Sequence, residues 1–352
     1  MSEMVIVKKD GLYCVPGDFY IDPWRPVDRA VITHAHSDHA RTGHAHYLAT
    51  AAGAGILRAR LGPISLDTLA YGETTVRNGV RLSLHPAGHV LGSAQLRMEY
   101  RGEVWVASGD YKLEADGTCQ AFESVPCDTF ITESTFGMPI YRWQPQAEIF
   151  DDINAWWCRN ADEGRTSVLF CYAFGKAQRI LHGLEADIGP IVCHGAVEPL
   201  NQLYRAAGVA LPRTLAVGDI TDKSSLRRAL VLAPPSAAGS PWMRRFGDYS
   251  DAFASGWMRL RGSRRRRGVD RGFVLSDHAD WPGLLSAIEA SRASRIIVTH
   301  GQIPTMVRWL QQNGLDAGAF DTEYGGEEEL EAVAETPAPS NAIPSEAQQQ
   351  DA

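Results

Sequence analysis

Short apolar runs separated by Gly, Pro and Asp fill the first 135 residues, and this pattern predicts β-strands. In Val80–Leu84 apolar and polar residues alternate, which is typical of a strand with one buried face. The other expected strands of this part are Ala30–Thr33, Ala94–Tyr100, Val104–Ala107 and Thr129–Thr132. The first part of the chain is therefore predicted to be β-rich.

The pattern changes near residue 145. Apolar residues at 149, 150, 153, 156 and 157 have nearly helical spacing and predict a helix over Ala147–Arg159. Expected strands and helices then alternate, as Ser167–Tyr172, Ala177–Leu184, Pro190–Cys193 and Glu198–Ala207. Alternation of this kind is typical of an α/β unit with parallel strands.

Turn-forming residues at 234–240 and an Arg-rich stretch at 259–267 interrupt this alternation. Strand patterns return at Gly272–Leu275 and Arg295–Thr299, with a helix expected at Trp281–Ala290 between them. A chain of 352 residues fits two domains at roughly 150 residues each. We expect one β-rich domain built from 1–143 and 269–325, an α/β insertion at 144–268, and a tail at 326–352.

The net charge of −8 is unevenly distributed. Nine acidic residues and no Lys or Arg lie between Asp321 and Ala352, so residues 1–320 carry about +1. A like-charged end rich in Glu, Ala, Pro and Gln is expected to be a disordered acidic tail. Within 241–272 nine arginines face three aspartates. The overall sign of the charge therefore does not exclude a nucleic-acid partner.

The sequence disfavours a membrane-spanning protein and a secreted protein stabilised by disulfides. No apolar run reaches the length of about 18 residues that a membrane span needs, and the first residues show no hydrophobic signal core. The six cysteines include no CxxC pair, which fits a reduced, cytoplasmic setting.

Four metal-competent side chains stand within six positions, directly after an expected strand. They are His34, His36, Asp38 and His39, in the run Thr33–His39. Neutral imidazoles and carboxylates suit Zn²⁺, Mn²⁺ or Fe, and the number of histidines favours zinc. The plain alternative is a solvated His-rich loop.

Six further polar residues come at or just after the ends of expected strands. They are Asp22, His89, Asp110, Glu133, His278 and His300. Strand ends in a layered sheet domain converge along one edge, so these distant positions are expected to share a pocket. A single His after a strand is more often a structural hydrogen-bonding group, but the set as a whole predicts a metal-dependent site.

The motifs themselves resemble those of a known family. THAHSDH at 33–39 is similar to the HxHxDH signature of the metallo-β-lactamase superfamily, and PAGHVLGSA and SGDYK resemble its later His and Asp motifs. ITESTFG, VLSDHAD and IIVTHG resemble the three additional motifs of its β-CASP branch of nucleases. Within that branch the chain is similar to bacterial ligase-associated DNA exonucleases over residues 10 to 325. The resemblance implies an αββα sandwich with an inserted α/β subdomain.

The same resemblance implies roles for individual residues. His34, His36 and His89 would hold one divalent metal ion, and Asp38, His39 and His300 a second, with Asp110 between the two. Asp22 would orient these ligands by hydrogen bonding. The ions, zinc or manganese, would activate a hydroxide that attacks phosphorus, with Asp38 in the catalytic group. His278 would be the general acid, and Glu133 would hydrogen-bond it.

The implied substrate is DNA, cleaved in bacterial repair beside a DNA ligase and a helicase. A ribonuclease remains open, because His at the position of His300 is usual in RNA-processing members of the branch. A thioester or lactone hydrolase is disfavoured because it gives Glu133 and His278 no evident use. A scaffold without activity is disfavoured because every ligand position is filled.

The sequence gives weaker evidence for residues that contact substrate phosphate than for the metal ligands. Gly175 and Lys176 form a turn before an expected helix, where backbone N–H groups can bind an anion; an ordinary strand-to-helix turn is equally compatible with them. Lys112 follows Asp110 closely and could touch a phosphate. Arg265, in the run of four arginines at 264–267, could neutralise phosphate near the mouth of the site, or lie in a solvated loop.

Overall fold

The computed structural model describes residues 3–220 and 224–324. The chain is mixed α/β, as predicted, and its described strands form three sheets. The expected acidic tail at 326–352 lies outside the described residues.

The first sheet contains six strands in sequence order. They are β1 (Val5–Lys8), β2 (Gly11–Cys14), β3 (Phe19–Ile21), β4 (Arg29–Val31), β5 (His46–Thr50) and β6 (Leu66–Leu69). The first three strands are antiparallel, and β3 to β6 are parallel.

The second sheet has seven strands. Their spatial order is β19 (Asp316–Ala319), β18 (Arg295–Gly301), β11 (Thr129–Ser134), β10 (Glu103–Ala107), β9 (Ala94–Tyr100), β8 (Val80–Pro86) and β7 (Thr74–Arg77). The strands β19, β18, β11 and β10 are parallel neighbours, so their carboxyl ends lie at one edge of the sheet. The polar residues that follow these strands are brought to that edge.

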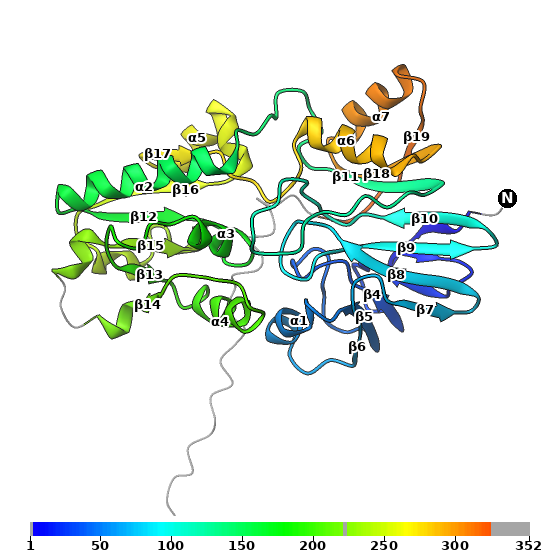
Figure 1. Cartoon of the computed structure of the whole chain (residues 1–352), viewed down its shortest axis with the longest axis horizontal. Coiled ribbons are helices and arrows are strands. Elements are labelled where there is room, and N and C mark those ends of the chain that lie inside the picture. The colour runs from blue at the N-terminus through cyan, green and yellow to red at the C-terminus, as the bar shows by residue number, and fades with distance from the viewer. Residues whose placement is uncertain (1–2, 221–223, 325–352) are drawn as a thin grey trace, which may run out of the picture.

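These two sheets pack face to face. Val5 and Leu12 of the first sheet are buried in one cluster with Leu82, Leu96 and Ile297 of the second. Helix α1 (Ala54–Leu61) covers the outer face of the first sheet, while α6 (Trp281–Ser291) and α7 (Ile303–Gln312) cover that of the second. The result is a helix–sheet–sheet–helix arrangement, seen on the right in Figure 1.

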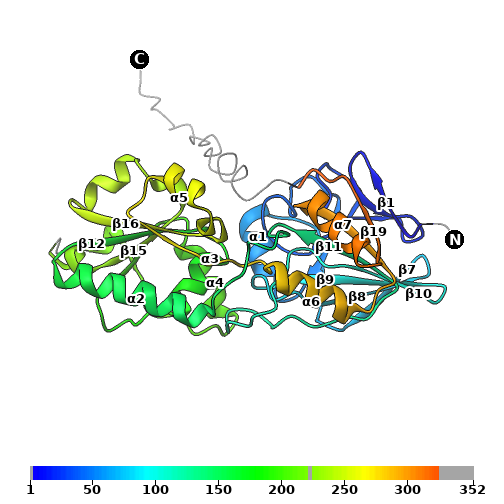
Figure 2. The same ribbon diagram turned by 90° about the horizontal axis from the view of Figure 1, so that it is seen from above.

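The third sheet forms a separate lobe on the left in Figures 1 and 2. All six strands are parallel, in the order β14 (Leu215–Ala216), β13 (Ile191–Cys193), β15 (Leu230–Ala233), β12 (Thr166–Phe170), β16 (Tyr249–Ala254) and β17 (Arg271–Phe273). Helices α2 (Gln146–Asp162) and α3 (Lys176–His182) bury their apolar residues against one face. The short helix α5 (Arg261–Arg267) precedes the last strand.

This third sheet enters the sequence between β11 and β18, which are neighbours in the second sheet. An α/β insertion was expected here. However, β17 pairs with β16, so the sheet reaches Phe273 and passes the expected boundary at residue 268. The Arg-rich stretch thus lies within this lobe, because one more strand of the same sheet follows it.

Helix α4 contacts the first lobe at two places. Helix α4 (Glu198–Ala206) packs Leu203 and Tyr204 beside Ile56 and Leu57 of α1. In the loop that follows β8, the backbone N–H of Leu91 donates to the hydroxyl of Tyr204 at 3.2 Å. The inserted lobe is thereby fixed beside the strand ends of the other two sheets.

Among the described helices, none has both the length and the apolar character needed to cross a membrane.

Candidate metal centre

Polar residues from five separate stretches of the chain meet where the carboxyl ends of the strands converge. The loop after β4 carries His34, His36, Asp38 and His39, and the loops after β8 and β10 carry His89 and Asp110. The ends of β11 and β18 contribute Glu133 and His300. All of these residues except His36 and His300 are buried.

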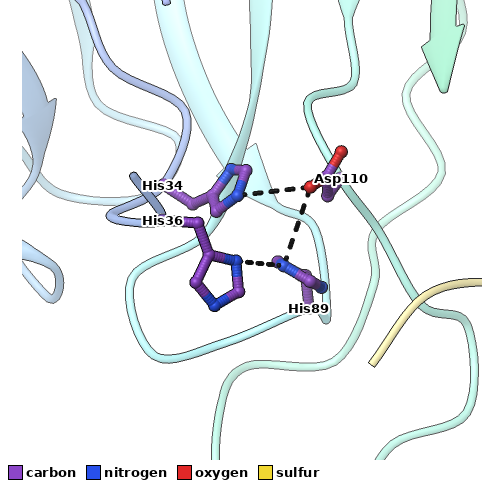
Figure 3. Close-up of side chains that lie close together, drawn as sticks. All are labelled: His34, His36, His89 and Asp110. Carbon is purple, nitrogen blue, oxygen red and sulfur yellow. Dashed lines mark hydrogen bonds and ion pairs between the residues drawn. The ribbon is translucent and has the colours of Figure 1, made fainter. Parts of the chain in front are cut away.

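One group consists of His34, His36, His89 and Asp110, whose possible ligand atoms lie within 4.8 Å of one another. Nε2 of His34 is 3.3 Å from Oδ2 of Asp110, and Nδ1 of His36 is 3.0 Å from Nε2 of His89. Figure 3 shows the three rings and the carboxylate turned toward a common point. The arrangement could hold one metal ion with three nitrogen ligands and one oxygen ligand.

A second group shares Asp110 with the first. It contains His39, Asp110 and His300. Nε2 of His39 lies 3.5 Å from Oδ2 of Asp110, and Nε2 of His300 lies 3.0 Å from its Oδ1. Asp38 is beside this group, with its Oδ2 atom 3.4 Å from Nε2 of His39. Asp110 therefore stands between the two groups.

Hydrogen bonds to Nδ1, on the side of the ring away from the centre, orient the imidazoles of His39 and His89. The carboxylate of Asp22 accepts from the backbone N–H of Thr33 at 2.7 Å and contacts Nδ1 of His39 at 2.8 Å. Nδ1 of His89 donates to the carbonyl oxygen of Asp277 at 2.9 Å. Because Nδ1 is engaged in each case, Nε2 remains as the atom that faces the centre.

The nitrogen and oxygen atoms that face the centre fit a divalent cation. Among the described residues, Nε2 of His34 and Nε2 of His39 are buried without a hydrogen-bond partner. Burial of a polar atom without such a partner is unfavourable, and a metal ion would satisfy both nitrogens. Burial lowers the pKa of His36 to about 4 and, with the neighbouring histidines, that of His89 well below its usual value. Both rings are therefore neutral at physiological pH, as metal ligands must be.

The acidic members of the centre remain ionised. Burial alone would raise the pKa of Asp110, but the charges of His39 and His278 hold it well below its usual value. The pKa of Asp38 is likewise lowered, because the effect of His39 outweighs that of burial. Burial alone would lower the pKa of His39, but the same carboxylates raise it well above its usual value, so this ring would release a proton on binding a cation. Ionised carboxylates are ligands that zinc and manganese accept.

A buried carboxylate–imidazole pair lies directly beside the metal groups. Nδ1 of His278 is 2.9 Å from Oε2 of Glu133, whose Oε1 accepts from the backbone N–H of Tyr111 at 2.9 Å. The ring of His278 is 4.6 Å from that of His89, centroid to centroid. A carboxylate in this position holds the imidazole in one orientation and stabilises its protonated form.

Tyr324, near the end of the described chain, was not predicted. Its ring stacks on that of His39 at 4.5 Å with 15° between the planes, and its edge meets His300 at 5.3 Å. Burial and the nearby Asp22 raise its pKa well above the usual value, so the hydroxyl is neutral. A lone aromatic residue in an acidic stretch gives no sequence signal for such a contact.

The turn at Gly175 and Lys176, a candidate phosphate-binding turn, is paired and packed within the protein. Lys176 is fully buried, and its ammonium group lies 2.9 Å from Oδ2 of Asp277. The N–H of Gly175 donates to Oε1 of Gln178 at 2.8 Å. A Cβ on Gly175 would lie 2.4 Å from Cγ1 of Val90, so this turn packs against protein rather than against substrate.

Lys112 is also engaged within the protein. It is 3% exposed, contacts Glu114 at 3.2 Å and donates to the carbonyl oxygen of Ser276 at 3.0 Å. Burial lowers its pKa to about 8. The ammonium group of Lys112 is therefore paired within the protein, and its contact to substrate phosphate stays a prediction. Arg265 has an exposed side chain on α5, and its contact to phosphate stays a prediction.

Three named relatives match parts of the sequence. The chain is 34% identical over 318 residues to a probable DNA ligase of Opitutus terrae, and the match covers 88% of this chain and 30% of that protein. It is 30% identical over 118 residues to Endoribonuclease YSH1 of Eremothecium gossypii, with 33% of this chain and 15% of the relative covered. Endoribonuclease ysh-1 of Neurospora crassa is 28% identical over 196 residues, and the match covers 51% of this chain and 22% of that protein.

The chain thus spans less than a third of the length of these curated relatives. No protein-family model matches it. A crystal structure of a protein of unknown function from Enterococcus faecalis V583 superposes with a TM-score of 0.58 at 12% identity, covering 84% of this chain and 80% of the other. That similarity shows a shared fold.

Proposed function

We propose that the chain is a metal-dependent phosphodiesterase, and specifically a DNA exonuclease of bacterial DNA repair. The observation that carries the proposal is the convergence of His34, His36, His89 and His300 around Asp110. The names of the relatives, a probable DNA ligase and endoribonucleases, support a nuclease-related family. In fold terms, the two packed sheets are the metallo-β-lactamase sandwich, and the third sheet is its β-CASP insertion.

The ligand roles follow from the two groups that share Asp110. His34, His36 and His89 would hold one divalent cation, and Asp38, His39 and His300 the other. Asp22 keeps the ring of His39 turned toward the centre through its 2.8 Å contact with Nδ1. Two such cations, zinc or manganese, would stabilise negative charge on a phosphate and lower the pKa of water to near neutrality.

His278 supplies the proton that the departing sugar oxygen needs. Its Nδ1 atom is tied to Glu133, which stabilises the protonated ring until the proton is transferred. Because the possible ligand atoms of Asp110, Glu133 and His278 lie within 4.8 Å of one another, the acid would be next to the cations. The lobe would form one wall of the cleft that admits a nucleic-acid end.

DNA is our preferred substrate because the relative that matches 88% of this chain is named a probable DNA ligase. Since this chain accounts for only 30% of that relative, the name need not describe the matched part. A DNA ligase and a helicase are the proposed functional partners, in the cytoplasm. None of the six cysteines, all of which lie in the described part of the chain, forms a disulfide bond, which fits that compartment.

An RNA-processing role is the second candidate. The endoribonuclease matches and the imidazole of His300 favour it. The test is digestion of end-labelled DNA and RNA oligonucleotides of matched sequence, single- and double-stranded, in the presence of Zn²⁺ or Mn²⁺. Shortening of DNA from one end supports the proposal, whereas clear preference for RNA would replace it with the second candidate.

A further inference from the structure

Four charged side chains are buried together at the junction between the inserted lobe and the metal centre. They are Asp116, Lys176, Arg179 and Asp277, and none is more than 8% exposed. Two are positive and two negative, so the cluster is formally neutral. Buried charges of this kind persist only where each one is paired. Lys176 is also the lysine for which the sequence allows either a phosphate contact or an ordinary strand-to-helix turn.

Asp277 is at the centre of this cluster. Its Oδ2 atom lies 2.9 Å from Nζ of Lys176, and its Oδ1 atom lies 3.1 Å from Nε of Arg179. The same Nε atom is 2.7 Å from Oδ2 of Asp116. Both cations come from α3 of the third sheet, whereas Asp277 belongs to the loop between β17 and α6. The pairs therefore bind the inserted lobe to that loop.

The cluster holds the metal-ligand candidate His89 at two points. The backbone carbonyl of Asp277 accepts the hydrogen bond from Nδ1 of His89 at 2.9 Å. From the other side, Nη2 of Arg179 donates to the carbonyl oxygen of His89 at 3.0 Å. The orientation of the His89 ring thus depends on where Asp277 and Arg179 lie.

The same loop carries the proposed acid. His278 follows Asp277 directly, and its carbonyl oxygen accepts from Nε1 of Trp143 at 3.0 Å. Nζ of Lys112 donates to the carbonyl oxygen of Ser276, two residues before His278, at 3.0 Å. Lys112 itself comes two residues after Asp110. Residues 276–278 are consequently held by side chains from both lobes.

We propose that Lys176 and Arg179, acting through Asp277, are positioning residues that set the geometry of His89 and thereby the metal affinity of the centre. The inserted lobe would then help to assemble the metal centre in addition to forming a wall of the cleft. This inference rests on the metal centre of the proposed function and is independent of the choice between DNA and RNA. An ion pair of this kind is by itself weak evidence for stability, so a purely structural role is the alternative to be tested.

The test is the affinity for Zn²⁺ alone, measured by competition with a chromophoric chelator on the full chain without nucleic acid. Lys176→Met removes the ammonium group and leaves a side chain of similar length. We expect the affinity of the tightest site to fall by about 10- to 100-fold, as for other groups that orient metal ligands. The folded fraction of each variant is checked by circular dichroism at the same temperature.

Asn160→Ala is the matched control. Asn160 is 6% exposed in α2, and its Nδ2 atom donates to Oγ of Ser167 at 2.9 Å, inside the inserted lobe. This variant loses a buried polar contact of the same lobe without touching residues 276–278 or His89. We expect it to unfold more easily and to bind Zn²⁺ with the affinity of the wild type.

A second variant covers the case in which Lys176→Met does not fold. Lys176→Met/Asp277→Asn removes one charge of each sign, leaves Arg179 paired with Asp116, and is expected to fold and to bind Zn²⁺ weakly. Wild-type affinity in either folded variant overturns the positioning role. A wild-type chain that takes up no Zn²⁺ contradicts the metal centre itself. One that binds Zn²⁺ but cleaves no nucleic acid contradicts only the proposed activity.

Discussion

Oδ2 of Asp22 lies 2.8 Å from Nδ1 of His39, on the side of the ring that faces away from Asp110. Oδ1 of the same carboxylate accepts the backbone N–H of Thr33 at 2.7 Å. A side chain at the end of β3 therefore sets both the start of the His-rich loop and the direction of one of its rings. On the proposed function, Asp22 would in this way orient a metal ligand.

The first prediction concerns this contact. Asp22→Ala removes the acceptor of Thr33 N and of His39 Nδ1, and an unsatisfied buried group costs about 1–3 kcal/mol. We expect metal affinity at the group of His39 and His300 to fall by about 10- to 100-fold. Chelator competition with Zn²⁺ measures the change. Asp18→Ala, which loses a surface hydrogen bond to Tyr13, is the control and should bind normally.

The second prediction concerns the shared carboxylate. Asp110→Ala removes an oxygen ligand from both groups, and His36→Ala removes a nitrogen ligand from one. Both variants should lose nuclease activity and bind less metal, and Asp110→Ala should lose more of it. Hydrolysis of a labelled oligonucleotide and metal analysis after dialysis measure the two effects. Normal turnover by either variant would place the active site elsewhere.

The third prediction separates the acid from the ligands. His278→Ala should slow cleavage by about 10²- to 10⁴-fold, the usual contribution of a general acid, and should retain bound metal. Glu133→Gln keeps the size of the side chain but removes the charge that stabilises protonated His278. It should therefore also slow cleavage. Loss of metal from His278→Ala would show instead that His278 is a ligand.

The fourth prediction concerns Tyr324. Tyr324→Phe keeps the ring that stacks on His39 and should behave as the wild type does, since the hydroxyl makes only a 3.4 Å contact with the carbonyl oxygen of Ile21. Tyr324→Ala removes the stacking, which contributes about 0.5–1.5 kcal/mol, and should weaken metal binding about threefold to tenfold. Equal metal affinities in the two variants would mean that the stacking does not matter.

Much of the fold could be predicted from local pattern. Ala94–Tyr100 is a strand over the residues predicted, because its apolar side chains face the core between the sheets. The strand β6 was missed because Asp67 and Thr68 are exposed and give no alternation. Helix α1 was missed for a similar reason, since only Ala54, Ile56 and Leu57 are buried.

The candidate site, too, could be predicted from the sequence only in part. The convergence of His34 and Asp110 could be expected because both follow strands, and strand ends share an edge. The ion pair of Lys176 could not be predicted, because its partner Asp277 lies far away in the sequence, in the loop between β17 and α6. A lysine at a helix start resembles a phosphate-binding group until the buried carboxylate opposite it is known.

The most direct test of the account is the number of metal ions bound per chain, measured by native mass spectrometry after dialysis against Zn²⁺. Side chains that meet around a shared Asp110 should hold two ions in the wild type. Asp110→Ala should hold fewer. A wild-type chain that binds no zinc, or one that retains two ions without Asp110, would contradict the account.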